Sequence, residues 1–196
     1  RVPIRLTFDD NYFNDRYQGI PIGGYTSIFE KMLDGIPVEL NTDFHLDRET
    51  FLSKFDHIIF TGPIDSFFDY SVGHLEYRSL RFDHQLVNCS DYQGNAVINH
   101  TESQIPYTRT YEHKHFDMNF SATNSAVTYE YPDKWEPGKI EIYPVNTDEN
   151  QSLFEKYQNM TKEVSNVTFG GRLGQYRYYD MHQVIASALE KVKSLA

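Results

Sequence analysis

Apolar and other side chains alternate over the first eight residues of the chain. Val2, Ile4, Leu6 and Phe8 each follow an arginine, a proline or a threonine. A period of two places successive side chains on opposite faces of a strand, so we expect a strand over residues 1–8. The acidic and aromatic residues that come next break the alternation and predict a loop.

Residues 21–72 have the pattern of the last part of an α/β domain. A helix is expected from Thr26, as its N-cap, to about residue 33. Its apolar face is formed by Ile28, Phe29, Met32 and Leu33. Short apolar runs predict strands over residues 38–40 and 57–60, and residues 52–55 favour a turn of helix. This order resembles the tail of a nucleotide-binding domain, although the chain contains no GxGxxG motif.

From residue 75 to residue 143, short aromatic and β-branched runs alternate with polar turns. This texture predicts an antiparallel sheet. The expected strands include residues 77–82, 96–100, 107–113 and 126–131.

The last part of the chain reads as helix, strand, glycine-rich loop and helix. A helix is expected over residues 152–164, a buried strand over 167–169, and a final helix from Met181 with Asp180 as its N-cap. The loop over residues 170–180 holds three glycines, which let a backbone approach a ligand closely. The free N–H groups of the helix start could face an anionic ligand. The alternative is an ordinary tight connection.

Composition narrows the possible partners. The 196 residues carry 18 basic and 28 acidic side chains, a net charge of −10, which argues against nonspecific nucleic-acid binding but not against a small anion. The single cysteine, Cys89, cannot form an intrachain disulfide, so a reducing cytosol fits best. No apolar run approaches the roughly 20 residues of a membrane span, and no signal peptide is recognised. The chain starts without methionine inside a patterned segment, so we expect a piece of a longer protein.

Isolated arginines are the first candidates for chemistry. Arg78, Arg109 and Arg172 stand among aromatic residues, and a planar guanidinium can give a phosphate two parallel hydrogen bonds. The alternative is pairing with surface carboxylates. His113 and His115, expected on one strand face, could ligate a metal, but no further ligand set is evident and a structural role is favoured.

Several strings in the chain resemble bacterial UDP-galactopyranose mutases. They run through nearly all 196 residues, and the most specific are DDNYF at 9–13, PYTR at 106–109, EHK at 112–114 and GRLGQYRYYDM at 171–181. The resemblance implies a cytoplasmic flavoenzyme that interconverts UDP-galactopyranose and UDP-galactofuranose for cell-surface galactofuranose synthesis. It implies reduced FAD, whose N5 forms an adduct with the sugar while UDP leaves and returns. It also implies a homodimer, no nucleic-acid partner and no membrane insertion.

The resemblance assigns roles to individual residues. Those implied to act in catalysis through the diphosphate are Arg1 and Arg109. Those implied to bind the substrate are Arg1, Tyr12, Arg78, Asn99, Arg109, Glu130, Tyr143 and Tyr178. Those implied to contact the cofactor are Phe44, Arg172, Tyr179, Asp180 and Met181.

The expected fold is mixed α and β, with an antiparallel substrate-domain sheet and part of a Rossmann-like FAD domain that the C-terminal helix completes. The expected divisions are residues 1–20 (strand and active-site loop), 21–72 (FAD-domain tail), 73–150 (substrate-domain sheet) and 151–196 (return to the FAD domain). The family's N-terminal half, with the dinucleotide fingerprint and most FAD contacts, is absent, so this chain alone is expected to be inactive.

Two other functions remain open at this point. An amine-oxidase-like flavoprotein would also fit the α/β tail and the glycine-rich loop, but it needs no diphosphate arginines. A non-catalytic sugar-nucleotide-binding module could use the aromatic sheet and would bind its ligand without a flavin.

Overall fold

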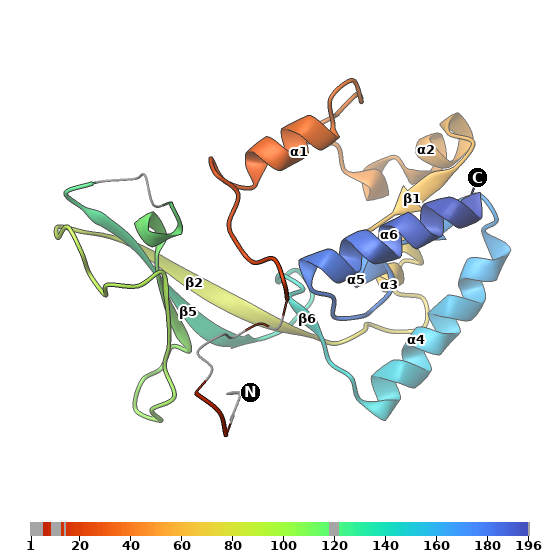
Figure 1. Ribbon diagram of the computed structural model, residues 1–196. Helices are drawn as coiled ribbons and strands as arrows, with labels where there is room; N and C mark the ends of the chain where they lie inside the picture. The colour runs from red at the N-terminus through yellow and green to blue at the C-terminus, as the bar shows by residue number, and fades with distance from the viewer. Residues whose placement is uncertain (1–5, 9–12, 14, 118–121, 196) are drawn as a thin grey trace.

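A computed structural model gives the fold of the chain (Figure 1). It describes residues 6–8, 13, 15–117 and 122–195. Two sheets organise this part of the chain, and the longest strands, β2 and β5, extend away from the helices α4 to α6. The expected class, a mixed helix and strand fold with an antiparallel sheet, is confirmed.

The strands are β1 (Ile58–Phe60), β2 (Tyr77–Val87), β3 (Val97–Asn99), β4 (Arg109–Glu112), β5 (Ser125–Lys134), β6 (Tyr143–Pro144) and β7 (Val167–Phe169). The α-helices are α1 (Thr26–Met32), α2 (Arg48–Lys54), α3 (Ile64–Phe67), α4 (Asp148–Met160), α5 (Gly171–Gly174) and α6 (Met181–Leu195). Three short 3-10 helices are η1 (Phe44–Leu46), η2 (His113–Phe116) and η3 (Thr161–Glu163). No helix in the described ranges combines the length and apolar character that crossing a bilayer requires.

The larger sheet is antiparallel, with strand order β3-β4-β5-β2-β6. Ten residue pairs join β2 to β5, from Arg78 opposite Lys134 to Val87 opposite Ser125. The strands expected from the aromatic runs are therefore present. This pairing matters for the site because it fixes which side chains share a face.

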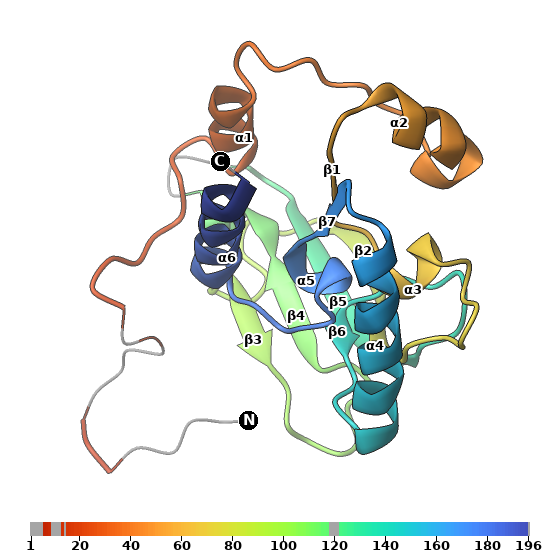
Figure 2. The same ribbon diagram turned by 90° about the vertical axis from the view of Figure 1, so that its right-hand side faces the viewer.

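The smaller sheet consists of β1 and β7, which pair in parallel. Figure 2 shows β7 and α5 between α4 and α6. The core beneath this layer is aromatic, since Phe60, Phe67 and Phe169 pack with ring centroids 4.9–5.9 Å apart. Tyr157 of α4 is fully buried and donates a hydrogen bond to the carbonyl of Gly73. These contacts fix the glycine-rich segment after β7 in place.

Some expected elements are absent or differ. Residues 6–8 form bends in which Leu6 and Phe8 are fully exposed, so the strand expected over 1–8 is wrong there, and residues 1–5 lie outside the described part. Residues 38–40 have no strand pairing, because an apolar run becomes a strand only beside a partner.

Two further expectations, one about a helix cap and one about a pair of histidines, are also wrong. Thr26 is the first residue of α1 rather than its cap, and Tyr25 precedes it without a side-chain cap bond. His113 and His115 lie on the helical turn η2, so they do not share a strand face as expected.

The helix α6 carries an exposed apolar stripe. Met181, Ile185, Leu189 and Val192 follow helical spacing and are 52–65% exposed. Exposed apolar patches of this kind favour association. We therefore expect the 196-residue polypeptide by itself to bind the dye ANS and to self-associate, as sedimentation velocity would show.

The matched variants separate the stripe from a change in net charge. Ile185→Lys with Leu189→Lys should reduce both dye binding and association. Ala186→Lys with Ser194→Lys adds the same charge at exposed positions elsewhere on α6 and should leave both unchanged. Equal effects of the two pairs would contradict the role of the stripe.

Candidate functional site

Five of the residues singled out in the sequence share one face of the larger sheet. Asn99 lies opposite Arg109, and Arg109 lies opposite Glu130. Arg78 lies opposite Tyr143 at the β2–β6 pair. Glu130 pairs with a β2 residue four positions after Arg78, so the period of two places both sets on the same face.

Arg109 is held on this face by two neighbours. Its Nε donates to Oδ1 of Asn99 at 2.8 Å, and its Nη1 lies 3.7 Å from Oε2 of Glu130. The Glu130 side chain is only 7% exposed, whereas that of Arg109 is 41% exposed. A hydrogen bond to Tyr111 raises the pKa of Arg109, burial opposes this, and the charge of Glu130 raises it further. The Arg109 guanidinium is therefore held in one orientation, with some of its N–H groups exposed to a ligand.

A second arginine joins the sheet to the glycine-rich segment. The Arg172 guanidinium lies over the rings of Tyr143 and Tyr178, at 5.4 and 4.8 Å from their centroids. Its Nη2 donates to the carbonyl of Ile142 at 3.1 Å. The distances to the two rings are those of favourable cation–π contacts. They bring β6, which pairs with β2, next to the residues that precede α6.

Four of the five residues expected at the cofactor line one pocket of about 630 Å³. Its lining includes Arg172, the run from Tyr178 to Met181, and the segment of residues 15–20. The Tyr178 hydroxyl donates to Oδ1 of Asp180 at 3.0 Å. Burial, and then the hydrogen bond to Asp180, raise the pKa of Tyr178, so its phenol stays protonated and able to donate.

Asp180 and Gln183 form hydrogen bonds at the N-terminus of α6. The backbone carbonyl of Asp180 accepts from Val184 N–H, and Asp180 N–H donates to Oε1 of Gln183 at 2.9 Å. Asp180 thus occupies the expected N-cap position, and Gln183 supplies the returning half of a capping box. Asp180, Met181 and His182, at the start of this 15-residue helix, line the pocket, so the positive end of the helix dipole lies beside it.

The structure places the remaining expected residues elsewhere or does not describe them. Phe44 packs in the aromatic core, 5.2 Å from Phe60 and 5.9 Å from Phe67 between ring centroids, and does not line the pocket. Arg1 and Tyr12 lie outside the described residues.

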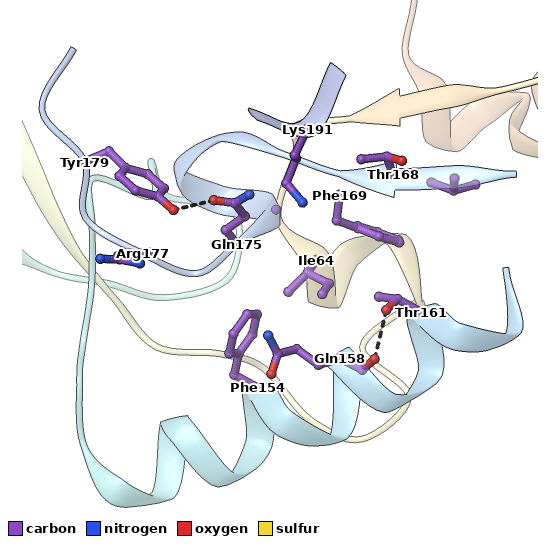
Figure 3. A pocket seen from close by; sticks show the side chains of 12 residues that line it. Ile64, Phe154, Gln158, Thr161, Thr168, Phe169, Gln175, Arg177, Tyr179 and Lys191 are labelled. Carbon is purple, nitrogen blue, oxygen red and sulfur yellow. Dashed lines mark hydrogen bonds between the residues drawn. The ribbon is translucent and has the colours of Figure 1, made fainter. Parts of the chain in front are cut away.

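A separate cavity of about 580 Å³ lies between α4, β7 and α6 (Figure 3). Lys191 points into it, and Phe169 and Ile64 form its apolar side. Of the expected site residues it includes only Tyr179, whose hydroxyl donates to Gln175. This cavity lies away from the sheet face that carries Arg109.

Sequence reasoning overlooked Tyr111. Its hydroxyl donates to Oε2 of Glu130 at 2.5 Å and accepts from Nη1 of Arg109 at 3.5 Å. A signal was present, because a residue two positions after Arg109 in a strand faces the same side.

Comparisons with known proteins show which family the chain resembles. A sequence model of the UDP-galactopyranose mutase family matches residues 1–178. A dTDP-fucopyranose mutase of Escherichia coli is 37% identical over 97% of this chain and 52% of its own length. A probable UDP-galactopyranose mutase of Klebsiella pneumoniae is 40% identical over 97% of this chain and 49% of its own length.

A crystal structure of reduced UDP-galactopyranose mutase shares the fold, with a TM-score of 0.55 over 72% of this chain and 42% of that chain at 16% identity. The chain spans about half the length of the curated relatives that it matches. The family match covers most of the chain and includes the strands that carry Arg78, Arg109 and Glu130. The chain belongs to the UDP-galactopyranose mutase family.

Proposed function

We propose that this chain supplies the diphosphate-binding part of an isomerase that interconverts UDP-galactopyranose and UDP-galactofuranose. We call a chain of family length that contains these 196 residues the complete mutase. The observation that carries the proposal is the oriented, half-open Arg109 on the same sheet face as Arg78 and Tyr143. The 196 residues alone are proposed to be inactive.

The reaction class explains why such a face is needed. UDP must leave the anomeric carbon, stay bound, and attack again after the sugar ring has changed size. Arg109 neutralises part of the negative charge of the diphosphate. Its contacts with Asn99 and Glu130 hold the guanidinium in place before further charge develops on the leaving UDP. Preorganised donors of this kind stabilise the departing oxygen without further rearrangement. Arg78 and the Tyr143 hydroxyl extend the donor surface, with Arg1 and Tyr12 as further proposed diphosphate contacts.

We propose reduced FAD as the cofactor, held at the pocket beside α6. Two features suit it: Arg172 Nε is buried and has no hydrogen-bond partner among the described residues, and residues 180–182 at the start of α6 line the same pocket. When bound, the flavin supplies the nucleophile for the anomeric carbon. Arg172, Tyr179, Asp180 and Met181 would orient the flavin edge. Phe44, in the core, has no evident part in this.

The family match suggests two further proposals, one about the assembly and location of the complete mutase and one about its substrate. The complete mutase is proposed to be a cytoplasmic homodimer that serves cell-surface galactofuranose synthesis. A second candidate substrate is a dTDP-linked sugar, because a dTDP-fucopyranose mutase is 37% identical to this chain. Both substrates present the same diphosphate to Arg109.

Ligand binding tests the proposal and separates the two substrates. The purified complete mutase should show a flavin absorption spectrum and should bind UDP in a calorimetric titration, with dTDP as the competitor. Tighter binding of dTDP than of UDP would favour the second candidate. A protein that holds flavin but binds neither nucleotide would contradict the diphosphate site.

A further inference from the structure

We infer that Tyr111 is a positioning residue for Arg109, acting through the buried carboxylate of Glu130. The inference rests on the proposed function, since it concerns the arginine that would bind the diphosphate. Tyr111 has no assigned role, and its side chain lies on the same sheet face as Arg109 and Glu130.

The hydrogen bonds assign a separate donor to each oxygen of Glu130. Oε1 accepts from the hydroxyl of Thr108 at 3.0 Å, and Oε2 accepts from the hydroxyl of Tyr111 at 2.5 Å. Oε2 is also the oxygen nearest Arg109, at 3.7 Å from Nη1. Tyr111 therefore fixes the oxygen that attracts the guanidinium. A buried carboxylate with both oxygens held has little freedom to turn away from its cation.

The phenol of Tyr111 is suited to donate. Burial raises the pKa of Tyr111 first, the hydrogen bond to Glu130 raises it further, and Arg109 opposes both. The hydroxyl thus keeps its proton through the neutral pH range. Because it donates that proton to Glu130, it can accept from Arg109 Nη1 at the same time.

The ring of Tyr111 is itself supported from the next rung of the sheet. Tyr111 lies opposite Thr128, whose hydroxyl is 2.6 Å from His113 Nε2 and 2.7 Å from His84 Nδ1. The Tyr111 and His113 rings are stacked at 6.5 Å between centroids. These contacts hold the ring, so that its hydroxyl oxygen stays within hydrogen-bond distance of both Glu130 and Arg109.

The test uses the complete mutase with its flavin and titrates it with UDP. Tyr111→Phe should weaken UDP binding by roughly tenfold, the size expected for losing one hydrogen bond to a charged group. It should raise KM and also lower kcat, because an arginine that is no longer held in place must be ordered again as charge develops on the departing diphosphate. Tyr129→Phe is the matched control: it removes a hydroxyl bonded to Tyr92 at 2.7 Å on the opposite face of the sheet, and should leave UDP binding unchanged.

A double-mutant cycle separates positioning from direct contact. If Tyr111 acts through Glu130, the effect of Tyr111→Phe on UDP binding should be much smaller in a Glu130→Ala background, which leaves the phenol no side-chain oxygen at that position. Additive effects, or equal effects of Tyr111→Phe and Tyr129→Phe, would overturn the inference. Failure of the wild-type protein to bind UDP would instead overturn the proposed function, so the two failures are distinguishable.

Discussion

Replacing Arg109 with alanine should lower kcat/KM of the complete mutase for UDP-galactofuranose by about 10²- to 10³-fold. The guanidinium is oriented by Asn99 at 2.8 Å and by the buried Glu130, and it is a half-open cation on the face proposed to bind the diphosphate. Arg109→Lys should recover only part of the loss, because an ammonium cannot give two parallel hydrogen bonds to a phosphate. Conversion of UDP-galactofuranose, followed by chromatography, measures both.

Arg81→Ala provides the matched control for that loss. Arg81 is exposed on the opposite face of the same sheet, with its guanidinium 4.0 Å from the centre of the Tyr131 ring. Its removal takes away one positive charge. It should change kcat/KM less than about twofold, because substitutions of exposed side chains away from a site have small effects. Equal losses in the two variants would mean that net charge, rather than the Arg109 geometry, matters.

Replacing Glu112 with alanine should destabilise the sheet by about 3–5 kcal/mol. The Glu112 side chain is fully buried and pairs with Lys114 Nζ at 2.9 Å, and Lys114 is itself only 9% exposed. Glu112 also accepts from the backbone N–H groups of Tyr92 and Gln93, at 2.8–3.1 Å. Its loss would leave the lysine charge buried with only the neutral oxygens of Ser90 and Ser125 as partners, and would free the loop before β3.

Hydrogen exchange in the complete mutase would measure this locally. The amides of Tyr92 and Gln93 should exchange more than about a hundredfold faster in Glu112→Ala, since 1.4 kcal/mol corresponds to tenfold. Asp133→Asn is the control, because its pair with Lys139 at 3.0 Å is one-third exposed and exposed pairs contribute about 0–1 kcal/mol. Unchanged exchange of the Tyr92 amide in Glu112→Ala would contradict the structural role.

Glu112 should also make the stability of the fold depend on pH. Burial disfavours the Glu112 carboxylate, but hydrogen bonds from Ser125, Tyr92, Gln93 and Lys114 outweigh it and hold the pKa of Glu112 below its ordinary value of 4.5. A lowered carboxyl pKa stabilises the fold above the unfolded value, and that contribution is lost as pH falls below about 4.5. Glu112→Gln should lack this acid-dependent loss of protection at Tyr92.

Local sequence patterns predicted most of the strands, but they did not predict which strands pair with one another. The aromatic and β-branched runs indicated β2, β4 and β5, because their spacing is a property of each segment alone. The apolar run at residues 38–40 had a similar pattern and formed no strand, since pairing depends on segments far along the chain.

The candidate site shows the same limit. Arg78, Arg109 and Arg172 could be singled out as isolated arginines, but their environments could not. The rung that joins Asn99, Arg109 and Glu130 depends on strand register, which no single segment fixes. Strand spacing could place Tyr111 on the face of Arg109, but its hydrogen bond to Glu130, 19 residues away on another strand, depends on the register.

The most direct test of the account is conversion of UDP-galactofuranose to UDP-galactopyranose by the complete mutase, with and without dithionite. The wild-type protein should convert UDP-galactofuranose only with the reductant, and Arg109→Ala should nearly abolish the conversion. A flavin-loaded, reducible protein that binds UDP but gives no conversion would contradict the proposed isomerase activity and favour a different flavoprotein reaction at the same site.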